Sequence, residues 1–154
     1  MKKPVFVFSA LAITSLSALA AEETFQASVQ VLTPITITED IAMSFGKIVA
    51  PGNGSPNTFF STGALPTGSG DGSYISGAQT AQIDVTGDGG NAYTVNAAAV
   101  ANGCSSTDLT LNITDPALSS ASTTLVDLDG SLDVASGTAA GSYTCDYTVT
   151  ANYQ

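Results

Sequence analysis

The chain has 154 residues, with three basic and thirteen acidic side chains and a formal net charge of −10. Nucleic acids and anionic membrane surfaces are bound through basic patches, so this charge balance excludes both as partners. The length suits one domain once a leader is removed.

Residues 1–20 have the pattern of a secretory signal peptide. Two lysines open the chain, an uncharged apolar run covers 5–19, and Ala18-Leu19-Ala20 supplies the small residues that signal peptidase accepts. We expect cleavage after Ala20, or one residue later, and export through the periplasm to the cell surface. The alternative, an uncleaved anchor, fits poorly because the run is short for a bilayer. No later stretch is long enough for a membrane helix, so no membrane insertion is expected.

The two cysteines, Cys104 and Cys145, predict one disulfide, because exported chains are oxidised. The bridge would close a loop of about forty residues, which contributes roughly 4 kcal/mol in the chain-entropy model. A metal pair is the alternative, but the chain has no histidine and no further cysteine to complete a zinc site. No cofactor is expected.

Residues 21–33 predict an N-terminal strand. Apolar side chains alternate with polar ones up to Pro34, which interrupts backbone donation. The apolar set is Phe25, Ala27, Val29 and Val31. This strand either completes its own sandwich or acts as a donor strand that docks into another molecule.

Residues 34–154 predict an antiparallel β-sandwich, because short alternating segments are separated by glycine-rich turns. A turn is expected at Glu39-Asp40, and no window shows an equally good helical period. Two hairpins are expected, 81–86 with 93–97 and 124–128 with 131–134, the second turning through Asp129-Gly130. Further short strands are expected at 35–38, 41–46, 58–62, 74–75 and 109–114.

The last segment, 143–154, is the clearest strand. Its odd positions read Tyr, Cys, Tyr, Val, Ala and Tyr, and its even positions are polar. A chain that ends on a half-buried strand has no downstream hairpin partner. Its neighbours must therefore come from earlier in the sequence or from another molecule.

Enzymatic chemistry is not expected. There is no histidine or arginine, Lys47 is the only basic side chain after the leader, and the acids sit mostly in turns. No Gly-x-Ser-x-Gly elbow is present for a serine nucleophile. The acidic stretch 127–133 resembles a calcium loop, but its glycine is at the fourth position rather than the sixth, which favours a hairpin.

Four aromatic side chains could line a sugar-binding platform or belong to the core. Without tryptophan, core packing is favoured. The four are Phe59, Phe60, Tyr74 and Tyr93.

Two resemblances arise from short motifs. The penultimate Tyr153, Gly141 at the fourteenth position from the end, and the alternation between them resemble the carboxy-terminal signature of fimbrial subunits assembled by the chaperone–usher route. More broadly, the chain is similar to the DUF4402 family of secreted bacterial domains. That similarity is carried by Pro34–Thr38, Ser44–Ile48, Ser61–Gly63 and the ending from Ala140.

The fimbrial resemblance implies an immunoglobulin-like or pilin-like sandwich in a structural subunit of a surface fibre. Such subunits polymerise by donor-strand exchange with copies of themselves or sister subunits, and they meet a periplasmic chaperone and an outer-membrane usher. The donor set is then the alternating apolar residues of 21–33. The alternative is a self-contained extracellular binding module, for example for glycans. The acceptor and chaperone-facing strand would contain Gly141, Tyr143, Tyr147, Val149 and Tyr153.

Overall fold

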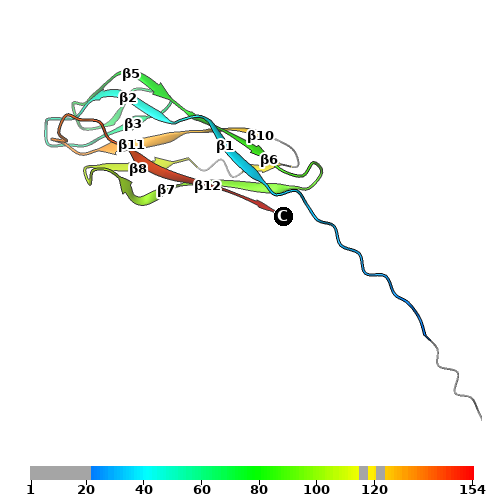
Figure 1. The fold of residues 1–154 in the computed structure, drawn as a ribbon. Helices are drawn as coiled ribbons and strands as arrows, with labels where there is room; N and C mark the ends of the chain where they lie inside the picture. The colour runs from blue at the N-terminus through cyan, green and yellow to red at the C-terminus, as the bar shows by residue number, and fades with distance from the viewer. Residues whose placement is uncertain (1–21, 115–117, 121–123) are drawn as a thin grey trace, which may run out of the picture. The chain divides into compact units, whose positions relative to one another are not determined.

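The computed structural model describes residues 22–114, 118–120 and 124–154, so the predicted signal peptide lies outside the described residues. Every regular element among them is a β-strand, and all pairings are antiparallel (Figure 1). The strands are β1 (Thr36–Ile41), β2 (Ser44–Val49), β3 (Asn57–Phe60), β4 (Thr67–Gly68), β5 (Ser73–Gln79), β6 (Ala81–Thr86), β7 (Tyr93–Cys104), β8 (Leu109–Ile113), β9 (Leu118–Ser120), β10 (Thr124–Leu128), β11 (Gly130–Val134) and β12 (Cys145–Tyr153).

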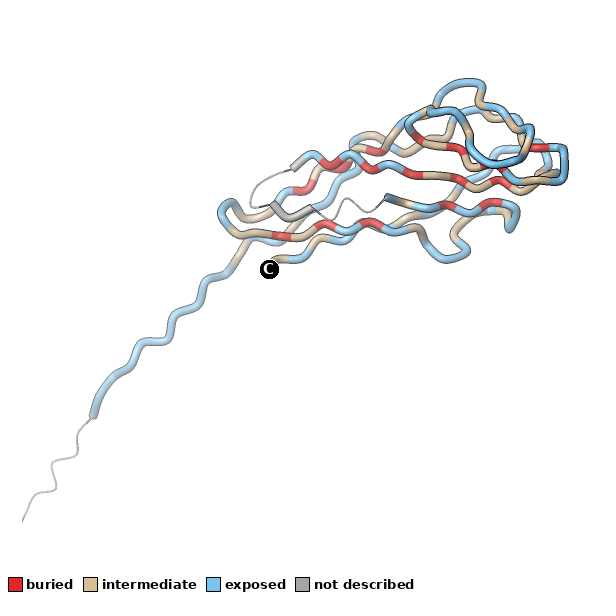
Figure 2. Tube along the Cα trace, turned by 180° about the vertical axis from the view of Figure 1, so that it is seen from behind, coloured by how far each residue is buried: buried red, intermediate tan, exposed pale blue. Residues whose placement is uncertain are grey.

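The strands form an antiparallel β-sandwich, as the alternation predicted. One apolar cluster joins the sheet β1-β6-β10 to the sheet β12-β7-β9 through inward residues of β6, β10 and β7. A second cluster lies among β3, β8 and β11, which belong to the sheet β4-β3-β11-β8. The sheet β2-β5 adds Phe45, Ile48 and Tyr74 to that cluster. Figure 2 shows the buried positions recurring along the strands, as period-two alternation requires.

The segment before Leu32 is a separate unit of the chain. The strand predicted at 21–33 is not formed: described residues 22–35 have no regular secondary structure. Phe25, Val29 and Val31 are 82–87% exposed, and Figure 2 colours this segment as exposed. An isolated extended segment has no ladder of backbone hydrogen bonds, so the alternation alone cannot hold it as a strand.

Both predicted hairpins are wrong. β6 pairs with β1 and β10, whereas β7 pairs with β12 and β9, so the glycine-rich connection crosses between layers. β10 pairs with β6, but β11 pairs with β3 and β8, so Asp129 marks a change of sheet. A local turn signal shows that the chain can bend, but the faces that must be buried decide whether the two strands pair or pack. The turn expected at Glu39-Asp40 lies within β1.

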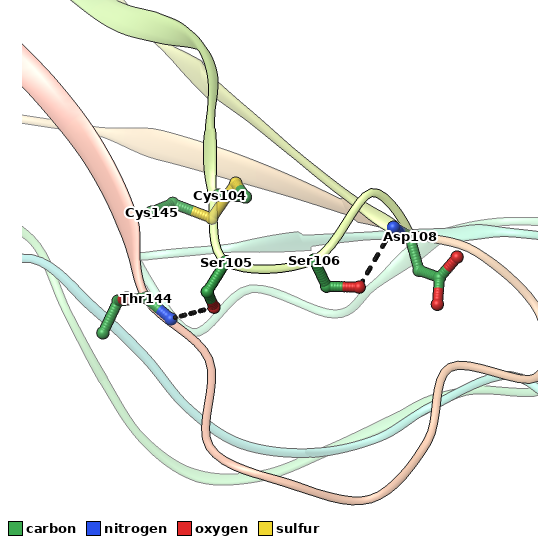
Figure 3. Close-up of a disulfide and its surroundings, with 6 residues drawn as sticks. All are labelled: Cys104, Ser105, Ser106, Asp108, Thr144 and Cys145. Carbon is green, nitrogen blue, oxygen red and sulfur yellow. Dashed lines mark hydrogen bonds between the residues drawn. A yellow bond between two sulfur atoms is a disulfide. The ribbon is translucent and has the colours of Figure 1, made fainter.

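The predicted disulfide between Cys104 and Cys145 is confirmed (Figure 3). The two cysteines are cross-strand partners on β7 and β12. Beside them, the Ser105 N–H donates to the Thr144 carbonyl oxygen at 2.8 Å, and the Thr144 N–H donates to Ser105 Oγ at 3.0 Å. The bridge and these bonds fix the start of β12.

Candidate functional site

β12 lies at the edge of its sheet and, among the described strands, pairs only with β7. Its odd positions are half-buried and its even positions are exposed, as the sequence predicted. None of the odd positions is fully buried. The inward face of this core strand therefore lacks complete cover.

β1 is the corresponding edge of the opposite layer. Ile37 pairs with Val85 and Glu39 pairs with Ile83, so both face the same side as two fully buried residues. Nevertheless Ile37 is 40% exposed, and Glu39 is exposed as well. The inward residues of β6 are buried, whereas Ile37 and Glu39 on the same side of β1 are exposed. The inward side of β1 at these positions therefore faces open space.

A groove whose lining is about as polar as it is apolar occupies this space between β12 and the β1–β2 run. It consists of a larger hollow of about 870 Å³ beside β2 and a smaller one of about 560 Å³ beside β1. We call the two together the edge groove. Residues common to both hollows are Met43, Thr144, Cys145 and Tyr147. The larger hollow reaches the second core cluster through Leu109, Leu111, Leu132 and Val134.

A side-chain hydrogen bond crosses the edge groove where its two hollows meet. The Tyr147 hydroxyl donates to Glu39 Oε1, and we call this contact the Tyr147–Glu39 bridge. Burial, then the hydrogen bond to Glu39 and its negative charge, raise the pKa of Tyr147. A backbone hydrogen bond from Met43 partly opposes that rise. β1 and β12 are thus joined by side chains at a place where neighbouring sheet strands would be joined by backbone.

A second tyrosine ties the far end of β12 to the beginning of the domain. The Tyr153 hydroxyl donates to the Thr33 carbonyl oxygen at 2.6 Å and accepts from the Asp88 N–H at 2.6 Å. Figure 1 shows β12 ending beside the start of β1. The two ends of the edge groove therefore differ: Tyr153 lies beyond one end, and Tyr143 lines the other.

The family model for a domain of unknown function, DUF4402, matches residues 35–153. The chain belongs to the DUF4402 family. No curated protein and no solved structure matches the chain. The matched range contains both walls of the edge groove.

The DUF4402 domain brings most of the predicted acceptor residues together. Gly141 and Tyr143 line the larger hollow, Val149 lines the smaller one, and Tyr147 lines both. Tyr153 lines neither and instead makes the hydrogen bonds at the end of β12. The predicted donor residues belong to the other unit of the chain.

The opposite wall of the groove was missed in the sequence. It contains Ile37, Glu39, Met43 and Phe45. The alternation of Ile35 and Ile37 continues to Glu39, which was a usable signal. It was hidden because the pair Glu39-Asp40 has the composition of a turn.

The described residues form neither an exposed row of the four aromatic side chains nor a cluster of metal ligands. Phe59 and Tyr93 are buried in the two core clusters, and Phe60 and Tyr74 are half-buried, so these four do not form an exposed aromatic row. The described ranges contain no group of three or more side chains able to hold a metal ion. Within the same ranges, no helix has the length and apolarity to cross a membrane.

Proposed function

We propose that this protein is a structural subunit of a surface fibre and polymerises by strand exchange. The N-terminal segment 21–33 of one copy fills the edge groove of the next. The observation that carries the proposal is an open groove between two edge strands, in a chain whose N-terminal segment exposes apolar side chains at every second position.

Backbone and side chains would contribute to docking in different ways. An added strand satisfies N–H and C=O groups along the free edge of β12, which supplies affinity with little regard to sequence. Full burial of Phe25, Val29 and Val31 would contribute about 1.5–3 kcal/mol each. Together they offset much of the roughly 4–15 kcal/mol that association costs in lost freedom.

The proposed partners are copies of this chain or sister subunits with a similar groove. The signal peptide pattern supports export through the periplasm. An open groove also needs cover before assembly, and a periplasmic chaperone strand along β12, followed by transfer at an outer-membrane usher, would provide it. The alternating carboxy-terminal strand with penultimate Tyr153 supports this route.

The test uses size-exclusion chromatography of the mature chain, with two variants that add the same charge. Val29→Asp places a carboxylate on the apolar face of the segment and should abolish multimers. Gln30→Asp places it on the polar face and should leave multimers in place, because only one face enters the groove. A wild-type chain that stays monomeric at all concentrations, or multimers that survive deletion of 21–31, would contradict strand exchange.

A further inference from the structure

The Tyr147–Glu39 bridge makes the edge groove uneven along its length. Glu39 faces inward on β1, and Tyr147 faces inward on β12, so their hydrogen bond lies on the core side of the space between the strands. A strand running through the groove passes over this bridge. Its inward side chain at that point meets the Tyr147 and Glu39 side chains, so we expect a small side chain to fit best there, whereas side chains on either side lie next to a hollow.

The N-terminal segment has the complementary pattern. Its apolar face contains Phe25, Ala27, Val29 and Val31, and Ala27 is the one small side chain among them. One large residue precedes it and two follow it. The bridge likewise has a smaller hollow on one side and a larger one on the other.

We infer that the occupant of the edge groove is residues 22–31 of a second copy of this same chain, antiparallel to β12, with Ala27 opposite Tyr147. This rests on the proposed function and adds the identity of the partner, its direction and its register. The Tyr147–Glu39 bridge is the specificity-determining feature, because it admits a small side chain at one position of the donor.

The antiparallel register places every large donor side chain beside a hollow. Phe25 falls opposite Val149 in the smaller hollow, and Val29 and Val31 fall opposite Cys145 and Tyr143 in the larger one. A parallel strand with the same Ala27 position would put Val31 opposite Ala151. That residue lines neither hollow, so the parallel direction would leave one valine without a pocket.

The direction also determines what the assembly becomes. The domain of each copy starts at Leu32, and Tyr153 is bonded to Thr33, so a domain begins at the Tyr153 end of its own groove. An antiparallel donor leaves its acceptor at the Tyr143 end, so consecutive copies join unlike ends. Heterologous contacts of this kind build open chains, whereas a parallel donor would bring like ends together and favour closed pairs.

Disulfide trapping between two mature full-length copies tests the register. Copies with Phe25→Cys are mixed with copies with Val149→Cys, assembled, and oxidised while the native disulfide stays closed. Directly opposed side chains on one face of a ladder lie close enough for such a bridge. We expect a linked pair on a non-reducing gel. The matched mixture of Val31→Cys with Ala151→Cys reports the parallel register and should stay unlinked.

The outcomes separate this inference from the proposed function. Multimers that link through positions 31 and 151, or through neither mixture, overturn the register and leave strand exchange standing. Absence of multimers from the unmodified mature chain, both alone and mixed with candidate sister subunits, overturns both. Multimers that form only with a different chain overturn the self-partner assignment alone.

Substitution at the small position gives an independent readout. Ala27→Leu should slow assembly by about tenfold or more, because an enlarged side chain would be forced against the bridge. Ala27→Ser should assemble as the wild type does. Combining Ala27→Leu with Tyr147→Ala in the acceptor should restore the rate. Equal rates for Ala27→Leu and wild type would overturn the inference.

Discussion

At the scale of single residues, Tyr147 lines the edge groove and its hydroxyl group joins β12 to β1 through the hydrogen bond to Glu39. Its pKa is raised above the ordinary value of 10.0 chiefly by burial, and next by the hydrogen bond to Glu39 and its charge. The folded chain therefore holds this proton after the unfolded chain has released it. The associated stability is fully present below about pH 10 and is lost as the pH rises through the folded pKa.

We therefore predict a late tyrosine in alkaline titration. Absorbance at the phenolate band should show one side chain ionising above the ordinary range, and Tyr147→Phe should remove that step. Urea unfolding at about pH 9 and about pH 11, on either side of the ordinary tyrosine pKa, should show a larger stability loss in the wild type than in Tyr147→Phe. The same loss in both proteins would contradict the assignment.

Ser61 is a second residue whose hydroxyl oxygen has a specific structural role, as a hydrogen-bond acceptor inside the domain. It is buried, its Oγ accepts from the Gly130 N–H at 2.9 Å, and its own N–H donates to the Gly130 carbonyl oxygen at 2.9 Å. Ser61→Ala leaves the buried Gly130 N–H without an acceptor, so we predict a loss of about 1–3 kcal/mol in the free energy of unfolding. Ser73→Ala, on exposed β5, is the matched control and should change little in urea unfolding. If both substitutions lowered the free energy of unfolding by similar amounts, the hydrogen bond to Gly130 would not explain the role of Ser61.

At the scale of strands, the β2–β5 pair depends on one close backbone approach. Gly46 has φ +66°, and a Cβ there would lie 2.7 Å from the Ala78 nitrogen and nearer still to the Ser76 carbonyl oxygen. Gly46→Ala must push β2 and β5 apart, and β2 lines the larger hollow of the edge groove. We predict a loss of more than about 2 kcal/mol, measured by thermal or urea unfolding.

Gly54→Ala is the control for that experiment. Gly54 also has a positive φ, of +87°, but a Cβ there would meet nothing within 4 Å. The free energy of unfolding of Gly54→Ala should fall only by the backbone conformational cost, about 1–2 kcal/mol. If Gly54→Ala destabilises the protein as much as Gly46→Ala, the close approach is not what requires the glycine.

Strands were predictable where the alternation is complete and the domain supplies a strand to pair with, whereas segment 21–33 has the alternation but forms no strand. β12, β8 and the disulfide followed from residue types alone, because one apolar face, or one cysteine pair in a chain expected to be exported, leaves few alternatives. Pairing was not predictable, as the connections after Thr86 and Leu128 show. Each was expected to be a hairpin, yet each leads to a different sheet, because burial of both apolar faces outweighs the local turn.

The residues of the candidate site likewise divide into those that the sequence pattern indicated and those that it did not. Tyr143, Tyr147 and Val149 were found from the pattern of one strand. Ile37 and Met43 were not, because their exposure depends on which strand stands opposite them. Such non-local relations are absent from a segment's own composition.

At the scale of the whole molecule, we propose that the domain is a sandwich with one strand position open. The edge groove separates two edge strands, and the segment with the matching pattern is a separate unit of the same chain. The assembled state should therefore be more stable than the single subunit. It should also depend on protein concentration, since a partner that binds only the folded form stabilises it by mass action.

This leads to a prediction about a rewired chain. Residues 21–31 are removed from the front of the mature protein, and Asn-Gly followed by a copy of residues 20–31 is added after Gln154. A two-residue Asn-Gly turn reverses the chain tightly, so the copied segment would return along β12 with its Ala27 opposite Tyr147. We predict a monomer whose free energy of unfolding exceeds that of the mature subunit held monomeric by Val29→Asp by more than about 2 kcal/mol.

A one-residue slip provides the control for the rewired chain. Omitting Ala21 from the copied segment keeps the turn and the composition but turns every apolar side chain towards solvent. Chromatography and urea unfolding should then show no gain in stability. A gain of the same size in both versions would mean that the added residues stabilise the domain without entering the edge groove in register. The gain should be confined to the in-register version, because the hollows lie on one face of the added strand.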